Sequence, residues 1–356
     1  MKKNYFIVAF FVFMFMPLLV SCFSKSGSFE LEEEGDVEII VGIDTTGIPV
    51  QEIQSVVDNT LAILATRLSQ MDYDRYFVQQ VDGQASLMVR VKGVTDRAQL
   101  RKALVSQANL GFWETFTSAE IIPYLRTLDS LYSANHQNVD EVPDQPVDDG
   151  SLESRINNKI WEEEFASRQS DHQLMEKLLV YYDTFGCIGR SKLSDVHKVD
   201  SILQSDEAKQ CLPQNLKLLW GAIPVSGYQD EGEYLELYAI KVTDPSGQAV
   251  VTGDCVVKAE SESTDWGPCI SIEMNSDGAR RWATMTRINT GSAIAIVVDD
   301  LVYSAPRVNG EITGGKSQIS GSFTIEETKS LAAILNSGRM PVRLFLTSER
   351  SFEPSK

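Results

Sequence analysis

A glycine-rich loop is the stretch of this chain that comes nearest to a catalytic motif. Residues 310–317 satisfy the nucleotide-binding pattern, in which two glycines are followed by Lys316 and Ser317. Such a loop must follow a buried strand and open a helix, because the helix N-terminus binds the phosphates. Here Asn309 and Gly310 give a hairpin-turn signal instead, and Ser317 leads into a strand-like segment. We therefore expect no nucleotide to bind here, and the sequence offers no other enzyme motif.

Sulfur chemistry is the second candidate, since the chain has five cysteines. Four of them lie in its second half, at Cys187, Cys211, Cys255 and Cys269. In an oxidising compartment these four can form two disulfides. Cys255 and Cys269 lie in neighbouring strand-like runs and are the favoured pair, with buried free thiols as the alternative. The cysteine spacing fits no zinc signature, and His136, His172 and His197 are far apart, so we expect no metal and no cofactor.

The fifth cysteine, Cys22, follows the layout of a secretory signal. A short basic start precedes an apolar run at residues 5–20, and Ser21 supplies a small residue before the cleavage point. This stretch resembles the lipobox of bacterial lipoproteins. The resemblance implies that residues 1–21 are removed and that the Cys22 thiol carries diacylglycerol, with further acylation such as palmitate. The alternative is a transmembrane helix, but the run is shorter than the about 20 residues that a span needs.

The charge balance excludes one class of partner. A net charge of −18 makes binding to nucleic acid unfavourable, because phosphate recognition depends on clustered lysine and arginine. The surface acids are instead expected to keep the protein soluble and to favour cationic or apolar partners.

The N-terminal elements indicate a ferredoxin-like base in an α+β protein. Alternating or amphipathic patterns predict, in order, a strand at 37–43, a helix at 50–71, a hairpin of 76–81 with 87–91, a helix capped by Thr95, and a strand at 110–115. This β-α-β-β-α-β order is typical of the ferredoxin-like fold. We assign residues 22–36 to a tether, and residues 37–117 together with 321–350 to the split base.

An insertion and a second, β-rich domain complete the chain. Residues 118–222 are predicted to be a helical insertion, with helices near 119–131, 152–168, 171–182 and 199–209 and a disordered acidic loop at 133–154. Residues 223–320 are predicted to form an α+β head rich in strands. Thr324 and Glu327 form a capping box for a helix that ends at Gly338, and a strand follows at 342–347.

The stretch from residue 274 to residue 343 resembles SecD and fused SecDF, accessory subunits of the bacterial Sec protein-export machinery. The resemblance is to their large periplasmic domain. It is carried by Asn275 with Gly278-Ala279, Thr286-Arg287 with Asn289, Ala295-Ile296-Val297 with Asp299, Ser304-Ala305-Pro306, Ile312-Thr313-Gly314-Gly315, Gln318-Ile319-Ser320-Gly321 and Phe323-Thr324 with Glu326-Glu327. Residues 108–115 are similar to Bacteroidetes members of the family in particular. The first half departs from the pattern, since Ser69 stands where the family has Asp.

The resemblance implies a polypeptide-binding protein and no enzyme. The expected partners are unfolded or translocating polypeptide and the Sec translocon membrane subunits, with a lipid bilayer holding Cys22. Its head would pivot on the base, and extended peptide would add to exposed sheet edges or lie in an apolar groove. The alternative is a split SecDF subunit whose residues 5–20 span the membrane. In the family, membrane helices follow the position of Arg350, so the family's proton-conducting residues are not carried over. We expect the protein in the cell envelope, facing the periplasm.

Overall fold

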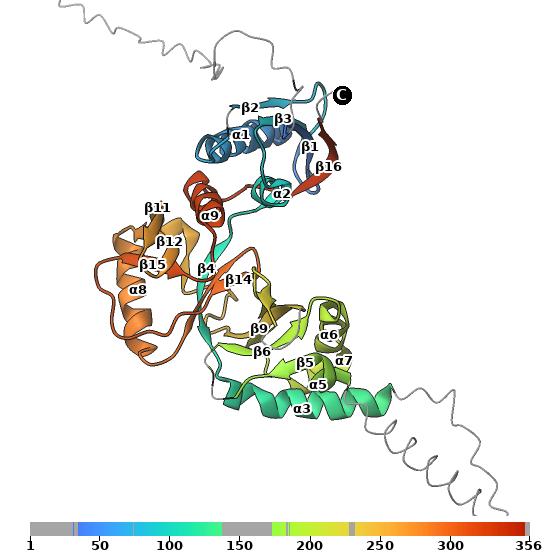
Figure 1. Ribbon diagram of the computed structural model, residues 1–356, viewed down its shortest axis with the longest axis vertical. Coiled ribbons are helices and arrows are strands. Elements are labelled where there is room, and N and C mark those ends of the chain that lie inside the picture. The colour runs from blue at the N-terminus through green and yellow to red at the C-terminus, as the bar shows by residue number, and fades with distance from the viewer. Residues whose placement is uncertain are drawn as a thin grey trace, which may run out of the picture.

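The computed structural model describes residues 31, 35–73, 75–136, 173–182, 184, 186–227 and 232–352. Within them, mixed helices and sheets confirm the α+β class (Figure 1). None of the helices in these ranges has the length and apolar character needed to cross a membrane. Ser21, Cys22 and the predicted helix at 152–168 lie outside the described residues, as does most of the predicted acidic loop.

The base is built on a four-stranded antiparallel sheet with the strand order β16-β1-β3-β2. Its elements are β1 (Val37–Ile43), α1 (Val50–Ser69), β2 (Arg75–Gln80), β3 (Ser86–Lys92), α2 (Arg97–Val105) and β16 (Leu344–Ser351). The sixth place of the ferredoxin-like order therefore belongs to β16, so placing residues 110–115 there was wrong. Ala108 has a φ of 59°, and beyond it β4 (Leu110–Thr115) enters a different sheet. Figure 1 shows β16, in red, beside the blue β1.

The core of the base follows from the two periodicities of its elements. Alternate residues of β1 and β3 point to one face of the sheet, where they meet the apolar stripe of α1. Val41, Leu87, Leu64 and Leu68 are wholly buried there. Burying each such side chain contributes about 1.5–3 kcal/mol, so this packing holds the distant β16 segment in place through Leu344.

A second, nine-stranded sheet occupies the middle and lower part of the molecule in Figure 1. Its strand path is β14-β13-β4-β9-β6-β5, with β10 paired to β4 and with β7 and β8 paired to β9. The strands other than β4 are β5 (Leu178–Val180), β6 (Cys187–Lys192), β7 (Leu216–Trp220), β8 (Val225–Ser226), β9 (Glu233–Lys241), β10 (Val251–Thr252), β13 (Ile294–Val298) and β14 (Leu301–Ser304).

The insertion is less helical than its sequence suggested, because β5, β6 and β7 all come from it. Its described helices are α3 (Ser118–Asn135), α5 (Gln173–Lys177), α6 (Val196–Leu203) and α7 (Asp206–Cys211). The helix predicted at 171–182 is wrong beyond Lys177, since Leu178 starts a strand paired with β6 and is buried beneath α3. The helix predicted at 199–209 is divided, because the Ser205 hydroxyl accepts a hydrogen bond from Ala208 N and starts α7.

A third sheet, which we call the head sheet, has the antiparallel order β11-β12-β15. It consists of β11 (Val256–Thr264), β12 (Gly267–Met274) and β15 (Lys316–Ser320), preceded by the 3-10 turn η2 (Gly253–Cys255). The helix α8 (Ser276–Ile288) has the predicted Asn275 cap, and α9 (Ile325–Ser337) has the predicted capping box.

Helix α9 lies between the head sheet and the base (Figure 1). It packs against β11 and β12 on one side and against α1 and α2 on the other. Leu331 and Ile334 are buried as predicted, whereas Leu335 is half-buried beside a cavity.

Candidate functional site

Two segments of the chain cross between the base and the rest of the molecule. Residues 106–109 join α2 to β4, and residues 338–343 join α9 to β16. The two crossings are hydrogen-bonded to each other, since Met340 N donates to Gln107 O at 3.0 Å. Any movement of the base relative to the head sheet must therefore bend both segments together.

Asp299 holds the first crossing by its side chain. It occupies the tip of the β13–β14 hairpin with Asp300, and both have positive φ, at 51° and 63°, a region that Asp tolerates. The Asp299 carboxylate accepts hydrogen bonds from Ser106 Oγ at 2.5 Å and from the backbone N–H groups of Gln107 and Asn109, each at 3.0 Å. These donors are about 190 residues away in sequence, as the separations of 193, 192 and 190 show. The sequence indicated a turn with local hydrogen bonds, and it gave no sign of this distant contact.

Arg67 holds the same place from the side of the base. Its side chain, in α1, is wholly buried. One guanidinium nitrogen donates to Ala103 O and Ser106 O, at 2.5 and 2.9 Å, and Nε donates to Ser337 Oγ at 3.1 Å. Burial lowers the pKa of Arg67 to about 10, and the negative charge of Asp299 opposes that shift. The guanidinium thus stays charged and joins α1 to the ends of both α2 and α9.

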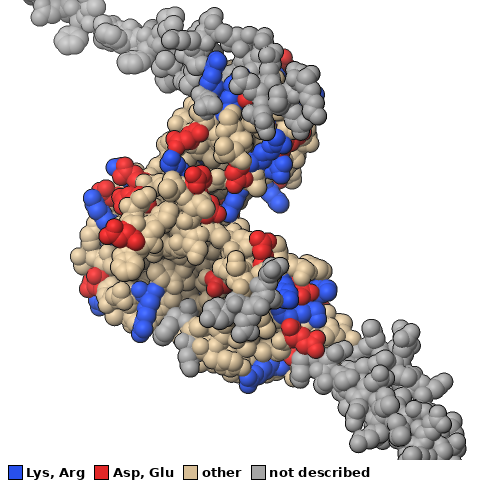
Figure 2. Space-filling view, in the orientation of Figure 1, with Lys and Arg blue, Asp and Glu red and all other residues tan. Residues whose placement is uncertain are grey.

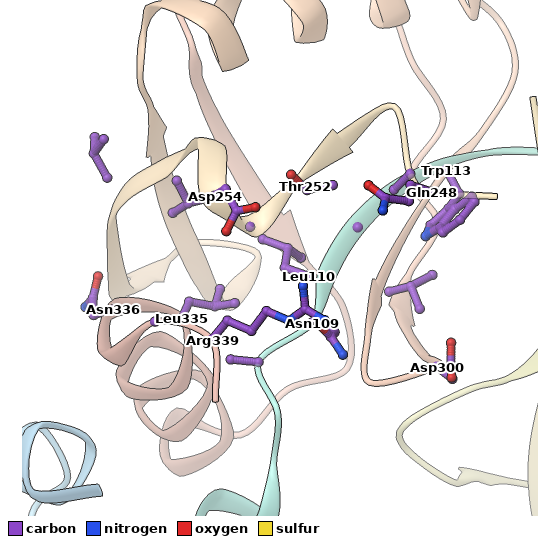
Figure 3. Close-up of a pocket in the computed structure, with 18 of the residues that line it drawn as sticks. Asn109, Leu110, Trp113, Gln248, Thr252, Asp254, Asp300, Leu335, Asn336 and Arg339 are labelled. Carbon is purple, nitrogen blue, oxygen red and sulfur yellow. The ribbon is translucent and has the colours of Figure 1, made fainter. Parts of the chain in front are cut away.

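A cavity of about 430 Å³ lies beside these crossings (Figure 3). Its lining comes from β4, from the end of α9 and from the segment around β10 and η2. The side chains are mostly polar and of both charges, including Asn109, Gln248, Asp254, Asp300 and Arg339. Among them we find no nucleophile next to a base, so the arrangement is suited to movement or binding rather than to bond cleavage.

The cysteines do not gather at this junction. Cys255 ends η2, Cys269 lies in β12, Cys187 begins β6, and Cys211 ends α7, and all four are free thiols in the structure. Burial raises the pKa of the Cys187 thiol to about 12, so this sulfur is chemically inert at neutral pH. Within the described ranges, no group of acids, cysteines and histidines is arranged to hold a metal ion.

The glycine-rich loop has the structural context that its sequence predicted. Lys316 and Ser317 are the first residues of the strand β15, so the loop does not open a helix. Gly315 has a φ of 64°, and a Cβ there would lie 2.7 Å from the Cβ of Ala279. Glycine at this position is therefore explained by a tight backbone turn against α8.

Comparison with known proteins gives this architecture a family. Residues 233–342 match the family described as SecDF, P1 head subdomain. This match extends beyond residue 320, where the sequence suggested that the head ends, and it places α9 with the head. The reason is physical, because α9 packs against β11 and β12 as well as against the base.

Whole-chain relatives agree with the family match. The protein translocase subunit SecD of Rhodothermus marinus is 29% identical over 86% of this chain and 48% of its own length. That of Sebaldella termitidis is 36% identical over 37% of this chain and 35% of its own. A crystal structure of SecDF in a super-membrane-facing form aligns over 93% of this chain and 32% of that one, at 17% identity and a TM-score of 0.45. The chain spans about half or less of the length of these relatives. It is therefore similar to SecD over most of its length, and its residues 233–342 form a SecDF P1 head subdomain.

Proposed function

We propose that this chain assists protein translocation by binding unfolded or translocating polypeptide with its head, next to the Sec translocon. The observation that carries the proposal is the match of residues 233–342 to the SecDF P1 head, within a chain whose curated relatives are translocase subunits. The two crossings tied by Asp299 and Arg67 support it, because a head joined to a base at one hydrogen-bonded junction can turn as a unit.

The described surface is consistent with a polypeptide partner. Figure 2 shows acidic and basic side chains interspersed over this face, without a broad patch of one sign. At the tip of the β11–β12 hairpin, Trp266 is 98% exposed, which offers an aromatic contact far from the base. Aromatic residues are enriched where proteins meet partners, because they bury a large area at low entropic cost.

Site-specific photo-crosslinking in intact cells tests this function. A photoreactive amino acid at Trp266 should yield adducts with exported precursor chains or Sec membrane subunits. The matched control is Val50, which is 85% exposed at the start of α1, on the base. Adducts that form equally from both positions, or only with proteins unrelated to export, would contradict the proposal.

We also propose that Cys22 is the first mature residue, after cleavage at Ser21, and that it is lipid-modified and anchors the chain to a membrane facing the periplasm. Support comes from the sequence, where a small residue and Cys22 follow the apolar run. The division into signal peptide, tether, base, insertion and head rests on the same reading. Several acyl chains give stable binding, since each buried CH₂ contributes about 0.8 kcal/mol.

Metabolic labelling with a palmitate analogue tests the anchor. The unaltered chain should be labelled and Cys22→Ala should not, while Cys211→Ala is the control and should keep the label. If Cys22→Ala fractionates with the membrane as before, the apolar run spans the membrane and the lipid proposal is wrong.

A further inference from the structure

The two outer strands of the head sheet are treated differently by the fold. On β11, the backbone N–H and C=O of Ala259 are both paired with the side-chain amide of Asn336, at 2.8 Å each. The amide thus replaces a neighbouring strand, and Ser261 Oγ is bonded to Thr328 Oγ1 on the same side. Helix α9 therefore closes this edge against further pairing.

The opposite edge, β15, has β12 as its one strand partner in the described part of the chain. Met274 N donates to Gly315 O at 2.8 Å, which fixes the phase of the ladder. Hydrogen-bonded pairs alternate along antiparallel strands, so Ser317 and Ile319 bond to β12. The backbone groups of Lys316, Gln318 and Ser320 consequently point away from the sheet, as those of Ala259 do on the other edge.

A cavity of about 680 Å³ adjoins this free edge. The β14–β15 loop forms its far wall, and Figure 1 shows that loop in orange passing beside α8. Its apolar lining consists of Trp282, Ile294, Pro306, Val308 and Ile312. Ile312 N is bonded to Thr286 Oγ1 at 3.0 Å, so the wall is anchored to α8 before any ligand arrives.

Trp282 marks the cavity as incomplete. The residue is 4% exposed, yet its indole Nε1 is buried without a hydrogen-bond partner. A buried donor without an acceptor costs free energy, and native proteins rarely leave one unpaired. A backbone carbonyl of a bound chain would supply the acceptor.

We infer that β15 and this cavity form a strand-addition site for an extended polypeptide segment in which apolar and polar residues alternate. The inference rests on the proposed function and names the substrate class of the same head. The added strand would bond to the outward backbone groups of Lys316, Gln318 and Ser320. One set of its side chains would enter the apolar cavity, and the other set would face solvent. Of the charged lining residues, two are cations, Arg307 and Lys316, and one is an acid, Glu311, so neutral or acidic polar residues suit the outer set.

Binding of a synthetic peptide to the full chain in detergent tests the site. The probe alternates valine with threonine and glutamate, and its control has the same sequence with N-methylated backbone amides. Gln318→Pro removes one outward N–H and leaves the bonds to β12, since proline is tolerated on an edge strand whose N–H faces solvent. It should weaken binding by about tenfold or more, while Gln318→Ala and Lys316→Ala, which keep the N–H groups, should stay within about twofold.

Two further measurements make the outcome decisive. Trp282→Phe keeps the ring but removes Nε1, and it should weaken peptide binding without loss of the folded circular-dichroism spectrum. Hydrogen exchange of the Gln318 amide should slow when the peptide binds. Equal binding of the N-methylated peptide, or unchanged binding by folded Gln318→Pro, overturns the site. Precursor adducts at Trp266 that persist in Gln318→Pro cells would leave the proposed function standing and refute this site alone.

Discussion

Replacing Asp299 with Asn should loosen the junction between base and head. The substitution keeps the size of the side chain and suits positive φ equally well, so the hairpin turn is not strained. Asn has one acceptor oxygen, whereas the Asp299 carboxylate accepts from Ser106 Oγ, Gln107 N and Asn109 N with its two oxygens. At least one bond is therefore lost and the others lose their charge assistance. Each hydrogen bond to a charged group is worth about 1.5–3 kcal/mol, so we expect a loss of about 2–4 kcal/mol in the free energy of unfolding.

The adjacent residue supplies a matched control. Asp300 occupies the same turn, but its carboxylate is 76% exposed and pairs with Lys217 at 2.6 Å. Exposed ion pairs contribute about 0–1 kcal/mol, so Asp300→Asn should be nearly neutral.

Urea unfolding of the full chain, followed by tryptophan fluorescence, measures both variants. Hydrogen exchange of the Gln107 and Asn109 amides should also quicken in Asp299→Asn, because these amides lose their acceptor. If the two variants unfold at the same urea concentration and exchange at the same rate, Asp299 does not hold the crossing and the reasoning fails.

Four further predictions concern stability and chemistry. Leu331→Ala should cost about 2–5 kcal/mol in a thermal melt, because Leu331 is 2% exposed in the core below α9, and a negligible shift would contradict that packing. Asn336→Ala should cost about 1–3 kcal/mol by losing both bonds to Ala259, whereas Asn135→Ala on the surface should be neutral. Cys187, whose pKa burial raises from 9.0 to about 12, should resist iodoacetamide near pH 9 in the folded chain and react in urea. Folding favours its protonated form, so this contribution is full below pH 9 and is lost as pH rises towards 12. Adding ATP should not change polypeptide binding, and a requirement for ATP would reverse our interpretation of residues 310–317.

Several elements could be predicted because their signals are short-range. The Asn275 cap, the capping box of Thr324 and Glu327, and the hairpin of β2 with β3 each depend on residues a few positions apart. Small offsets remain, since Asp96 rather than Thr95 caps α2. The resemblance to SecD was readable for the same reason, as its motifs keep their order and spacing along residues 275–327.

The distant pairings were decided by tertiary structure. Strand β1 pairs with β16, whose residues are about 300 positions away in sequence, because Leu344 completes the apolar core of the base; nothing in the pattern of residues 37–43 names that partner. The strands of the insertion formed because Leu178 and its neighbours found a sheet to join, whereas alone the segment could equally continue a helix.

The sequence by itself determined the local elements, the expected signal region and the family. The junction was decided only by the fold. The type of Asp299 predicts a turn, but its hydrogen bonds to Ser106, Gln107 and Asn109 exist because β13 and β4 pair and bring the hairpin tip to the crossing. The free edge of β15 is likewise a property of what packs nearby, since Asn336 covers one side of the head sheet and no side chain of α9 reaches the other. Local propensity acts over a few residues, whereas hydrogen-bond partners of a buried carboxylate or a sheet edge are set by which segments the core draws together.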